Sequence, residues 1–258
     1  TSFPRLDVGW AQETALDLDM ASAICPACKI LLVEGDTNSF ANLAAAVNTA
    51  ASLGAHVISN SYGGGESGST AVEAAYNHAG VAITASSGDA GFGVEFPASS
   101  PHVVAVGGTS LRTAGTARGW TETAWINSVS GCAQLSTKPA WQHDTGCANR
   151  MVADVSAVAD PATGVAVYGP TVDTSGVVGP PAWMVFGGTS AAAPIISGVY
   201  GVNGGTVHGG ADPYSHLSGL FDIKSGITGF CDPTYFCNSA TGYDGPTGLG
   251  TPNGSSAF

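Results

Sequence analysis

A short glycine-rich stretch ending in a serine has the clearest chemical potential in this sequence. Two glycines and a Thr-Ser pair, Gly187 to Ser190, lead into three alanines and Pro194. This pattern predicts a tight loop that opens a helix. Ser190 would then lie beside unpaired backbone N–H groups at the positive end of the helix dipole. Such donors stabilise an oxyanion that forms next to a serine nucleophile. Taken alone, the Thr-Ser pair is more typical of a serine that caps a helix.

Two carboxylates near the start of the chain could supply the base that a serine nucleophile needs. Glu13 and Asp17 are four residues apart in a predicted helix, so they share one face. Their alanine- and leucine-rich neighbours predict partial burial, and two carboxylates in a poorly solvated place cannot both ionise easily. One would accept a proton while the other acts as its partner, which suits general-base chemistry at acidic pH. A solvated acidic face is the alternative interpretation.

A third carboxylate, Asp89, lies in a loop between Gly88 and Gly91, where the backbone can turn sharply. Asp89 could simply stabilise its own turn. It could instead stay protonated and donate a hydrogen bond to an oxyanion.

Composition narrows the class of protein. With 258 residues, 44% of them hydrophobic, the chain can bury one large core, so we expect a single domain over 1–258. The formal net charge of −12 makes nucleic acid and anionic membranes poor partners. No apolar run approaches the ~20 residues of a membrane-spanning helix. Few charges, 10% of residues, suit a secreted protein that meets low pH.

The six cysteines fall into three close pairs: Cys25/Cys28, Cys132/Cys147 and Cys231/Cys237. This arrangement favours three short-loop disulfides and an oxidising compartment. A zinc or redox site at Cys25–Cys28 is the rival interpretation. It is disfavoured because a structural zinc site needs four ligands and no second Cys-x-x-Cys is present.

The hydrophobic pattern predicts a parallel sheet of βα units with right-handed crossovers. Irregular structure is expected over 111–181, and Gly/Pro/Asp-rich loops over the last forty or so residues. The predicted helices cover 10–24, 39–52, 70–79 and 190–202, and the predicted strands cover 29–34, 55–60, 81–85 and 103–106. In such sheets functional sites gather at the carboxyl ends of strands, which places 60–64 and 86–91 among the informative loops.

Several stretches together resemble the sedolisins, the serine-carboxyl peptidases. Their order and spacing match along nearly the whole chain: 13–19 (ETALDLD), 87–91 (SGDAG), 96–101 (FPASSP), 106–109 (VGGT) and 188–190 (GTS) with Pro194. The resemblance implies a subtilisin-like α/β fold with helices on both faces of a parallel sheet. It also implies that the protein is secreted and active at acidic pH, and that it hydrolyses peptides or proteins as an endopeptidase or a tripeptidyl-peptidase. Members of the family are made as zymogens with a removable prodomain.

The same resemblance assigns roles to individual residues. It implies Ser190 as the nucleophile, Glu13 as its general base, Asp17 as the residue that orients Glu13, and Asp89 in the oxyanion hole. It also implies a structural Ca²⁺ site in the C-terminal loops, and carboxylates with backbone carbonyls are hard oxygen ligands suited to that ion. The implied ligands are the side chains of Asp222 and Asp244 and the carbonyls of Ile223, Ala240 and Gly242. Family members usually have glycine in place of Ala240.

The sequence departs from the family at its start. Family catalytic domains have several dozen residues, including a central strand, before the helix that carries Glu13, whereas here that helix begins about ten residues in. We therefore expect a separate polypeptide, the protein's own N-terminal fragment, to supply the strand after cleavage near Thr1. A chain that folds alone, with its sheet edge covered by 111–181, is the alternative.

Two other functions remain as alternatives. An ordinary subtilisin-like protease would need a histidine base where Glu13 stands. None of the six histidines lies on that helix: His56, His78, His102, His143, His208 and His216. A catalytically dead scaffold that only binds peptides is the second alternative, and the presence of every implied catalytic residue argues against it.

Overall fold

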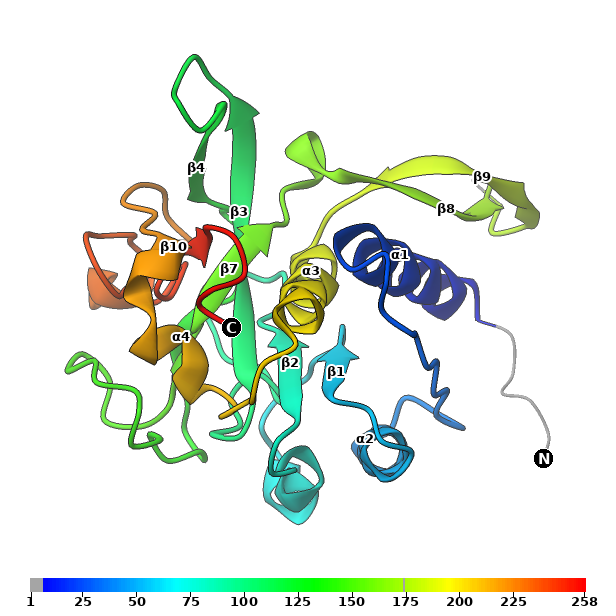
Figure 1. Ribbon diagram of the computed structural model, residues 1–258, viewed down its shortest axis with the longest axis horizontal. Coiled ribbons are helices and arrows are strands. Elements are labelled where there is room, and N and C mark those ends of the chain that lie inside the picture. The colour runs from blue at the N-terminus through cyan, green and yellow to red at the C-terminus, as the bar shows by residue number, and fades with distance from the viewer. Residues whose placement is uncertain (1–6, 174) are drawn as a thin grey trace.

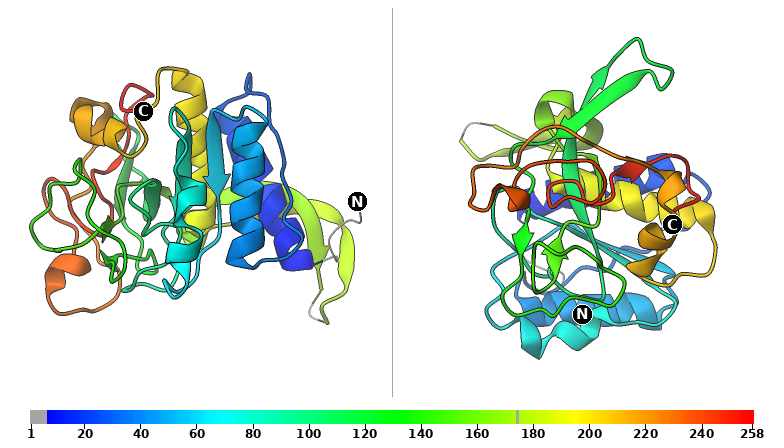
Figure 2. Two further views of the ribbon diagram at one scale, coloured as in Figure 1. Left: turned by 90° about the horizontal axis from the view of Figure 1, so that it is seen from below. Right: turned by 90° about the vertical axis from the view of Figure 1, so that its left-hand side faces the viewer.

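A mainly parallel sheet forms the centre of the computed structural model, which describes residues 7–173 and 175–258 (Figure 1). Strands β1 (Val57–Asn60), β2 (Ala82–Ser86), β3 (Val104–Thr113) and β7 (Val155–Val158) pair in parallel in that order. The second half of β3 pairs antiparallel with β4 (Trp120–Ala124), and the two continue beyond the sheet as a ribbon (Figure 2). The predicted α/β class is confirmed.

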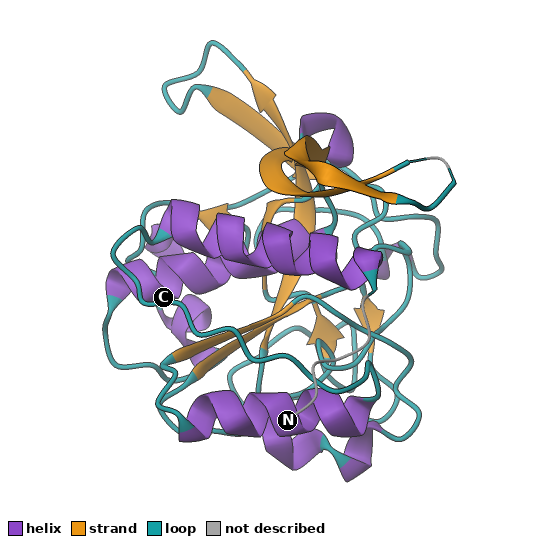
Figure 3. Ribbon diagram, turned by 90° about the vertical axis from the view of Figure 1, so that its right-hand side faces the viewer, coloured by secondary structure: helices purple, strands orange, loops and turns teal. Residues whose placement is uncertain are grey.

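Helices cover both faces of the sheet, as Figure 3 shows. Helix α2 (Phe40–Ser52) packs on one face, and α3 (Thr189–Asn203) packs on the other. Along β3, Ala105 belongs to the α2 side of the core, whereas Val104 and Val106 belong to the α3 side. Successive side chains of a strand point to opposite faces, so the continuous apolar run of β3 serves both layers.

Helix α1 (Val8–Ile24) lies directly against α3. It begins at an N-cap aspartate, Asp7, whose side chain accepts a hydrogen bond from the backbone N–H of Trp10. The two helices meet closely at Gly198, where an added Cβ would lie 2.6 Å from Cβ of Ile24. A larger residue at Gly198 would push α1 away from α3, so this contact fixes the position of α1.

A long hairpin covers the outer side of α1 (Figure 1). Its strands are β8 (Val165–Val172) and β9 (Val178–Phe186). Together with α1 and α3 it encloses a small core made of Leu16, Met20, Val167 and Ala191. Most of the hairpin lies in the segment for which the sequence predicted irregular structure. The strands were missed because apolar and polar residues alternate along them and because they include prolines and glycines instead of continuous apolar runs.

One predicted strand is wrong. No strand forms over 29–34, and Ile30, Leu31 and Leu32 are about half exposed. Strand β1 pairs only with β2 within the described residues, so the segment has no paired neighbour. Apolar composition predicts burial but says nothing about whether a partner strand is within reach.

The predicted helix over 70–79 is also wrong. Two 3₁₀ turns occupy the region, Ser69–Ala71 and Glu73–Tyr76, and neither has a side-chain cap. A short stretch with unmet terminal N–H groups gains too little from regular α-helical bonding to propagate. The other predicted helices and strands are confirmed within a few residues, although β3 is longer than expected.

The remaining helices and strands are short and lie within the connecting loops. They are β5 (Gly131–Cys132), β6 (Met151–Val152), η3 (Pro161–Thr163), α4 (Ala211–Ser215), η4 (Leu217–Gly219), β10 (Leu220–Phe221), η5 (Thr234–Phe236) and β11 (Thr251–Pro252). The C-terminal forty residues are largely loops, as predicted.

The three predicted disulfides are present: Cys25–Cys28, Cys132–Cys147 and Cys231–Cys237. Within the described residues, no helix combines the length and hydropathy that crossing a bilayer requires. The cleavage expected near Thr1 falls outside the described residues.

Candidate active site

Ser190 is the second residue of α3. The N-cap is Gly188, which has no side chain to cap with, so Ser190 does not act as the cap. Gly188 has a φ of 91°, and a Cβ there would lie 2.6 Å from Oδ2 of Asp89. Only glycine lets the loop pass this close to Asp89 without strain. Gly188 is therefore explained by the approach of a carboxyl group from another part of the chain, whereas a Cβ at Gly187 would collide with the backbone of Ala159 and Pro161.

Asp89 lies at the N-terminus of α3 although it belongs to the loop after β2. Its Oδ1 accepts hydrogen bonds from the backbone N–H of Thr189 (2.8 Å) and from the Thr189 hydroxyl (2.9 Å). The Thr189 hydroxyl oxygen accepts a bond in turn from the N–H of Gly88 (3.0 Å). Asp89 thus caps the helix in place of a local residue and joins the two loops. Its Oδ2 has no such partner among the described residues.

The carboxyl group of Glu13 faces the Ser190 hydroxyl from α1. Burial raises the pKa of Glu13 to about 7, the Ser190 hydroxyl lowers it in part, and the negative charge of Asp89 raises it further. Oε1 of Glu13 is buried and has no hydrogen-bond partner among the described residues. A buried carboxyl group with an unused oxygen next to a hydroxyl is suited to accept a proton.

Asp17 lies one helical turn after Glu13 and on the same face. Burial raises its pKa to about 8, a hydrogen bond from Ser61 lowers it, and the charge of Glu13 raises it. The Ser61 hydroxyl donates to Oδ1 of Asp17 at 2.5 Å. The like charges of Glu13 and Asp17 oppose each other, so the pair favours a state that shares one proton.

Sequence reasoning gave Ser61 no role, yet Ser61 also touches the start of α3. Its hydroxyl lies 3.2 Å from the backbone carbonyl oxygen of Ser190. Pro194 has no N–H, so the carbonyl of Ser190, four residues earlier, has no regular helical partner. The Ser61 hydroxyl has one hydrogen to donate, and the shorter distance favours Asp17 over this carbonyl as its acceptor. The available sequence signal was its place directly after β1, at the carboxyl edge of the sheet.

The structure therefore brings Glu13, Asp17, Asp89 and Ser190 together from three separate segments. They meet where β1 and β2 end and α3 begins. Together these groups can support nucleophilic attack with proton transfer. The site has a hydroxyl, a carboxyl group that faces it, a second carboxyl group one helical turn away and a third at a helix N-terminus. Among the described residues, Glu13 and not a histidine faces the Ser190 hydroxyl.

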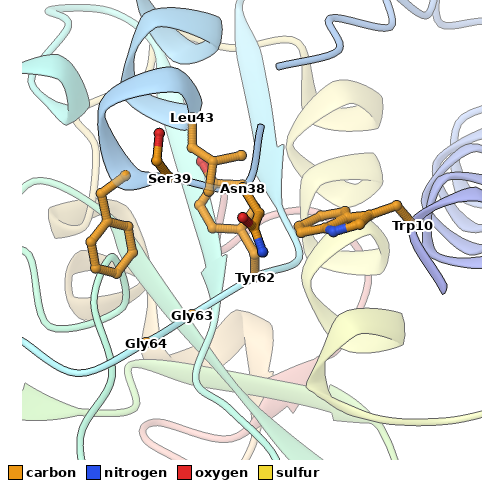
Figure 4. A pocket seen from close by; sticks show the side chains of 8 residues that line it. Trp10, Asn38, Ser39, Leu43, Tyr62, Gly63 and Gly64 are labelled. Carbon is orange, nitrogen blue, oxygen red and sulfur yellow. The ribbon is translucent and has the colours of Figure 1, made fainter. Parts of the chain in front are cut away.

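A pocket of about 360 Å³ opens between α1, the start of α2 and the segment after β1 (Figure 4). Trp10 reaches into it from α1, one turn before Glu13, and Tyr62 reaches into it from the segment after β1. The rest of its lining is Asn38, Ser39, Phe40, Leu43, Gly63 and Gly64. A largely apolar pocket with exposed backbone, one helical turn from Glu13, is a suitable place for a peptide side chain.

The predicted calcium ligands lie together in the C-terminal loops. Oδ2 of Asp222 accepts a bond from the N–H of Gly242 (3.0 Å), and Oδ2 of Asp244 accepts one from the N–H of Ala240 (2.8 Å). The carbonyl oxygen of Ile223 lies 3.4 Å from a nearby threonine hydroxyl. Burial raises the pKa of Asp244 to about 6, and the charge of Asp222 contributes to the rise.

Nowhere in the described residues do three His, Cys, Asp or Glu side chains gather as a metal-binding group. A cation in these loops would therefore depend on two carboxylates and on backbone carbonyls. This donor set is chemically suited to Ca²⁺, because both kinds of ligand are hard oxygens and a cation would relieve the repulsion between Asp222 and Asp244.

Comparisons with known proteins identify relatives of this chain. Residues 10–203 match the profile of the Subtilase family. The chain is 32% identical to kumamolisin from Bacillus sp. (strain MN-32) over 94% of its own length and 49% of that protein. It is 32% identical to sedolisin from Pseudomonas sp. (strain 101), over 62% of the chain and 29% of that protein. The chain thus spans half or less of the length of these relatives.

Solved structures show the same relationship. The structure of Pseudomonas sedolisin, a serine-carboxyl proteinase complexed with pseudo-iodotyrostatin, superposes with a TM-score of 0.77 at 27% identity. That alignment covers 96% of this chain and 77% of the other. Sphericase shares the fold, with a TM-score of 0.55 at 21% identity, over 84% of this chain and 64% of the other. The predicted subtilisin-like fold and the resemblance to sedolisins are confirmed.

The raised pKa values predict how stability depends on pH. The native state keeps protons on Glu13 and Asp17 between their ordinary pKa values of 4.5 and 3.8 and the raised values of about 7 and about 8. The unfolded chain has lost those protons in this range, so stability falls as pH rises from 4 to 8. We expect thermal unfolding at pH 8 to occur several degrees below that at pH 5.

The double variant Glu13→Gln/Asp17→Asn should flatten this dependence, because neither amide titrates. Asp36→Asn, at an exposed position, serves as the control and should keep the wild-type slope. Equal pH slopes in the wild type and the double variant would show that these two groups do not cause the effect.

Proposed function

Because the chain belongs to the subtilase family of peptidases, we propose that it hydrolyses peptide bonds through an acyl-enzyme on Ser190, with Glu13 as general base. The observation that carries the proposal is the position of the buried Glu13 carboxyl group against the Ser190 hydroxyl at the start of α3. We assign Asp17 the role of orienting Glu13, because it lies one helical turn away on the same face and is itself bonded by Ser61.

The proposed reaction follows from these positions. The Ser190 oxygen attacks the carbonyl carbon of the scissile bond while its proton passes to Glu13. The oxyanion forms beside the N-terminus of α3, where a protonated Asp89 donates a hydrogen bond to it from the Oδ2 side. Glu13 then protonates the departing amine. A water molecule, activated by Glu13, hydrolyses the acyl-enzyme and restores the Ser190 hydroxyl.

We propose activity at weakly acidic pH. Asp89 can donate only while it is protonated, whereas Glu13 must be ionised to act as base. The negative charge of Asp89 is one of the causes that raise the pKa of Glu13, so a protonated Asp89 makes Glu13 easier to ionise. Burial of Glu13 acts in the opposite direction and moves the acid limb toward neutrality. We therefore expect a bell-shaped profile whose maximum lies below pH 7.

The test is cleavage of fluorogenic peptides across pH 3–9. Ser190→Ala should lower kcat by roughly 10⁴-fold or more, because the nucleophile is lost. Glu13→Gln should be nearly as damaging, because an amide cannot accept the proton. The matched controls Ser52→Ala and Glu34→Gln, both at exposed positions, should keep wild-type rates.

Near-normal turnover by Ser190→Ala, or a profile that rises through neutrality to an alkaline plateau, would contradict the mechanism. Paired substrates with free and acetylated N-termini separate the two kinds of peptidase. A tripeptidyl-peptidase releases a fixed length from the free terminus, whereas an endopeptidase accepts both substrates.

We also propose that the protein is secreted and that a segment of its own precursor, an N-terminal fragment or prodomain, packs against the outer edge of β1. Three short disulfides support an oxidising compartment. The open edge of β1 and the exposed Ile30 to Leu32 stretch support a covering segment. Of the strands in 111–181, β4 and β7 pair with β3, and the others pair with each other outside this sheet, so none of them pairs with the outer edge of β1.

Intact-mass analysis of the denatured protein from its native source tests the fragment. We expect a second polypeptide of the same precursor to co-purify in equal amount. A single active and monomeric species consisting of this chain alone would exclude it.

Finally, we propose that Ca²⁺ binds Asp222 and Asp244 with the carbonyls of Ile223, Ala240 and Gly242. The ion would hold the C-terminal loops together and take no part in the chemistry, since its ligands come from other loops than those of Ser190. Binding only to the native state raises stability by mass action.

A chelator should therefore lower the unfolding temperature. With Ca²⁺ at a hundredfold excess over its dissociation constant, we expect a difference of about 5–10 °C. Asp244→Asn should abolish the effect of added Ca²⁺, whereas Asp36→Asn should leave it intact. Identical unfolding with and without chelator would show that no ion binds there.

A further inference from the structure

Ser61 is a buried residue that takes no part in the reaction proposed above. It directly follows β1. Its hydroxyl oxygen lies 2.5 Å from Oδ1 of Asp17 in α1 and 3.2 Å from the carbonyl oxygen of Ser190 in α3. One side chain after β1 therefore contacts both the helix of the proposed base and the helix of the proposed nucleophile.

Ser59 shows that a hydroxyl in this part of the chain need not have a partner. It lies two residues earlier, in β1, and its Oγ is buried without a hydrogen bond to any of the described residues. The contacts of Ser61 thus result from the approach of α1 and α3 and are not a general feature of serines near the end of β1. Ser59 also offers a matched control for them.

The Ser61 hydroxyl restricts where Asp17 can hold a proton. Oδ1 of Asp17 is the nearer of the two acceptors that this hydroxyl can reach. A carboxyl oxygen that accepts a hydrogen bond from a hydroxyl is a poor site for a proton, because the two hydrogens would face each other. Since Glu13 and Asp17 favour a state that shares one proton, Oδ2 is the oxygen of Asp17 left to hold it.

The charge that acts on Asp17 comes from its own helix. Burial raises the pKa of Asp17, the hydrogen bond from Ser61 lowers it, and the charge of Glu13 raises it. Asp19, also in α1, accepts a bond from the backbone N–H of Tyr168 in β8 (2.8 Å). Helix α3 contains no charged residue. The other titratable groups of the surrounding segments are phenols, namely those of Tyr168 in β8, Tyr62 after β1 and Tyr200 in α3.

We propose that Ser61 is a positioning residue, because its hydroxyl engages Oδ1 of Asp17 and confines the shared proton to Oδ2. The inference rests on the proposed function, since it explains how Asp17 orients the base. A proton on Oδ2 can be donated to the ionised Glu13, which leaves the other oxygen of Glu13 to accept the proton of Ser190. Without the Ser61 hydroxyl, either oxygen of Asp17 could hold the proton.

The first test follows the titration of the Asp17 carboxyl group by ¹³C NMR in a Ser190→Ala background, with the resonance assigned from Asp17→Asn. Adding Ser61→Ala should raise the upper titration midpoint by about one pH unit, because the ionised carboxylate loses its donor. Adding Ser59→Ala should leave the midpoint unchanged. An unchanged midpoint with Ser61→Ala would overturn the inference. A lower midpoint would also overturn it, because the hydroxyl would then accept the Asp17 proton instead.

The second test is turnover of fluorogenic peptides at the pH of maximal activity. Ser61→Ala should lower kcat about tenfold and change KM by less than about twofold, because substrate binding does not use this hydroxyl. Ser61→Thr keeps a hydroxyl at the position and should recover most of the rate, whereas Ser59→Ala should match the wild type. Thermal unfolding at pH 5 checks that each variant is folded.

The two tests separate this inference from the proposed function. A raised midpoint in a protein that cleaves no peptide would support the contact of Ser61 with Asp17 and contradict only the peptidase. Cleavage at the wild-type kcat by Ser61→Ala would overturn the inference and leave the peptidase intact. An unchanged midpoint together with no cleavage would overturn both.

Discussion

The active site depends on burying two carboxyl groups one helical turn apart. Glu13 and Asp17 repel each other and are poorly solvated, so their proximity is unfavourable unless the surrounding structure imposes it. The close contact of α1 with α3 at Gly198 and the cover provided by β8 impose it. The free energy of apolar packing along α1 thus offsets the cost of holding a proton-accepting group beside Ser190.

The start of α3 is the point to which the other segments are tied. Asp89 caps it from the loop after β2, and Ser61 approaches the carbonyl that Pro194 leaves without a helical partner. Asp89 thus satisfies the first backbone N–H of the helix, that of Thr189, from a loop that is distant in sequence. The helix terminus therefore fixes the relative positions of the loops after β1 and β2, and the same contacts that complete the helix also order the site.

Chemistry and specificity draw on the same edge of the sheet but on different segments. The proposed reacting groups come from α1, α3 and the Asp89 loop, whereas the pocket is lined by Gly63 and Gly64 in the segment after β1. Glycines expose the backbone and leave room for neighbouring side chains, which suits a surface along which a peptide lies. Within the described residues, β1 pairs only with β2.

The sequence by itself determined the class of fold, three disulfides and the family, because these depend on local pattern: apolar strands between helices, paired cysteines, and motifs in a fixed order. It also identified Glu13, Asp17, Asp89 and Ser190 as the residues to examine, and the tertiary structure brings them together. The prediction of a strand over 29–34 was wrong, because apolar composition could not reveal that no neighbouring strand is available to pair with this segment.

Only the tertiary structure assigned contacts to Ser61 and Glu95. Neither residue stands out in the sequence, because its contacts come from distant segments. Ser61 approaches the carbonyl of Ser190, and the Glu95 carboxyl group occupies the space that Gly63 and Gly88 leave free. The raised pKa values of Glu13 and Asp17 likewise depend on burial created by α3 and the β8–β9 hairpin, more than a hundred residues away in sequence. Spacing along a chain can place two groups on one helical face, but desolvation is set by what packs against that face.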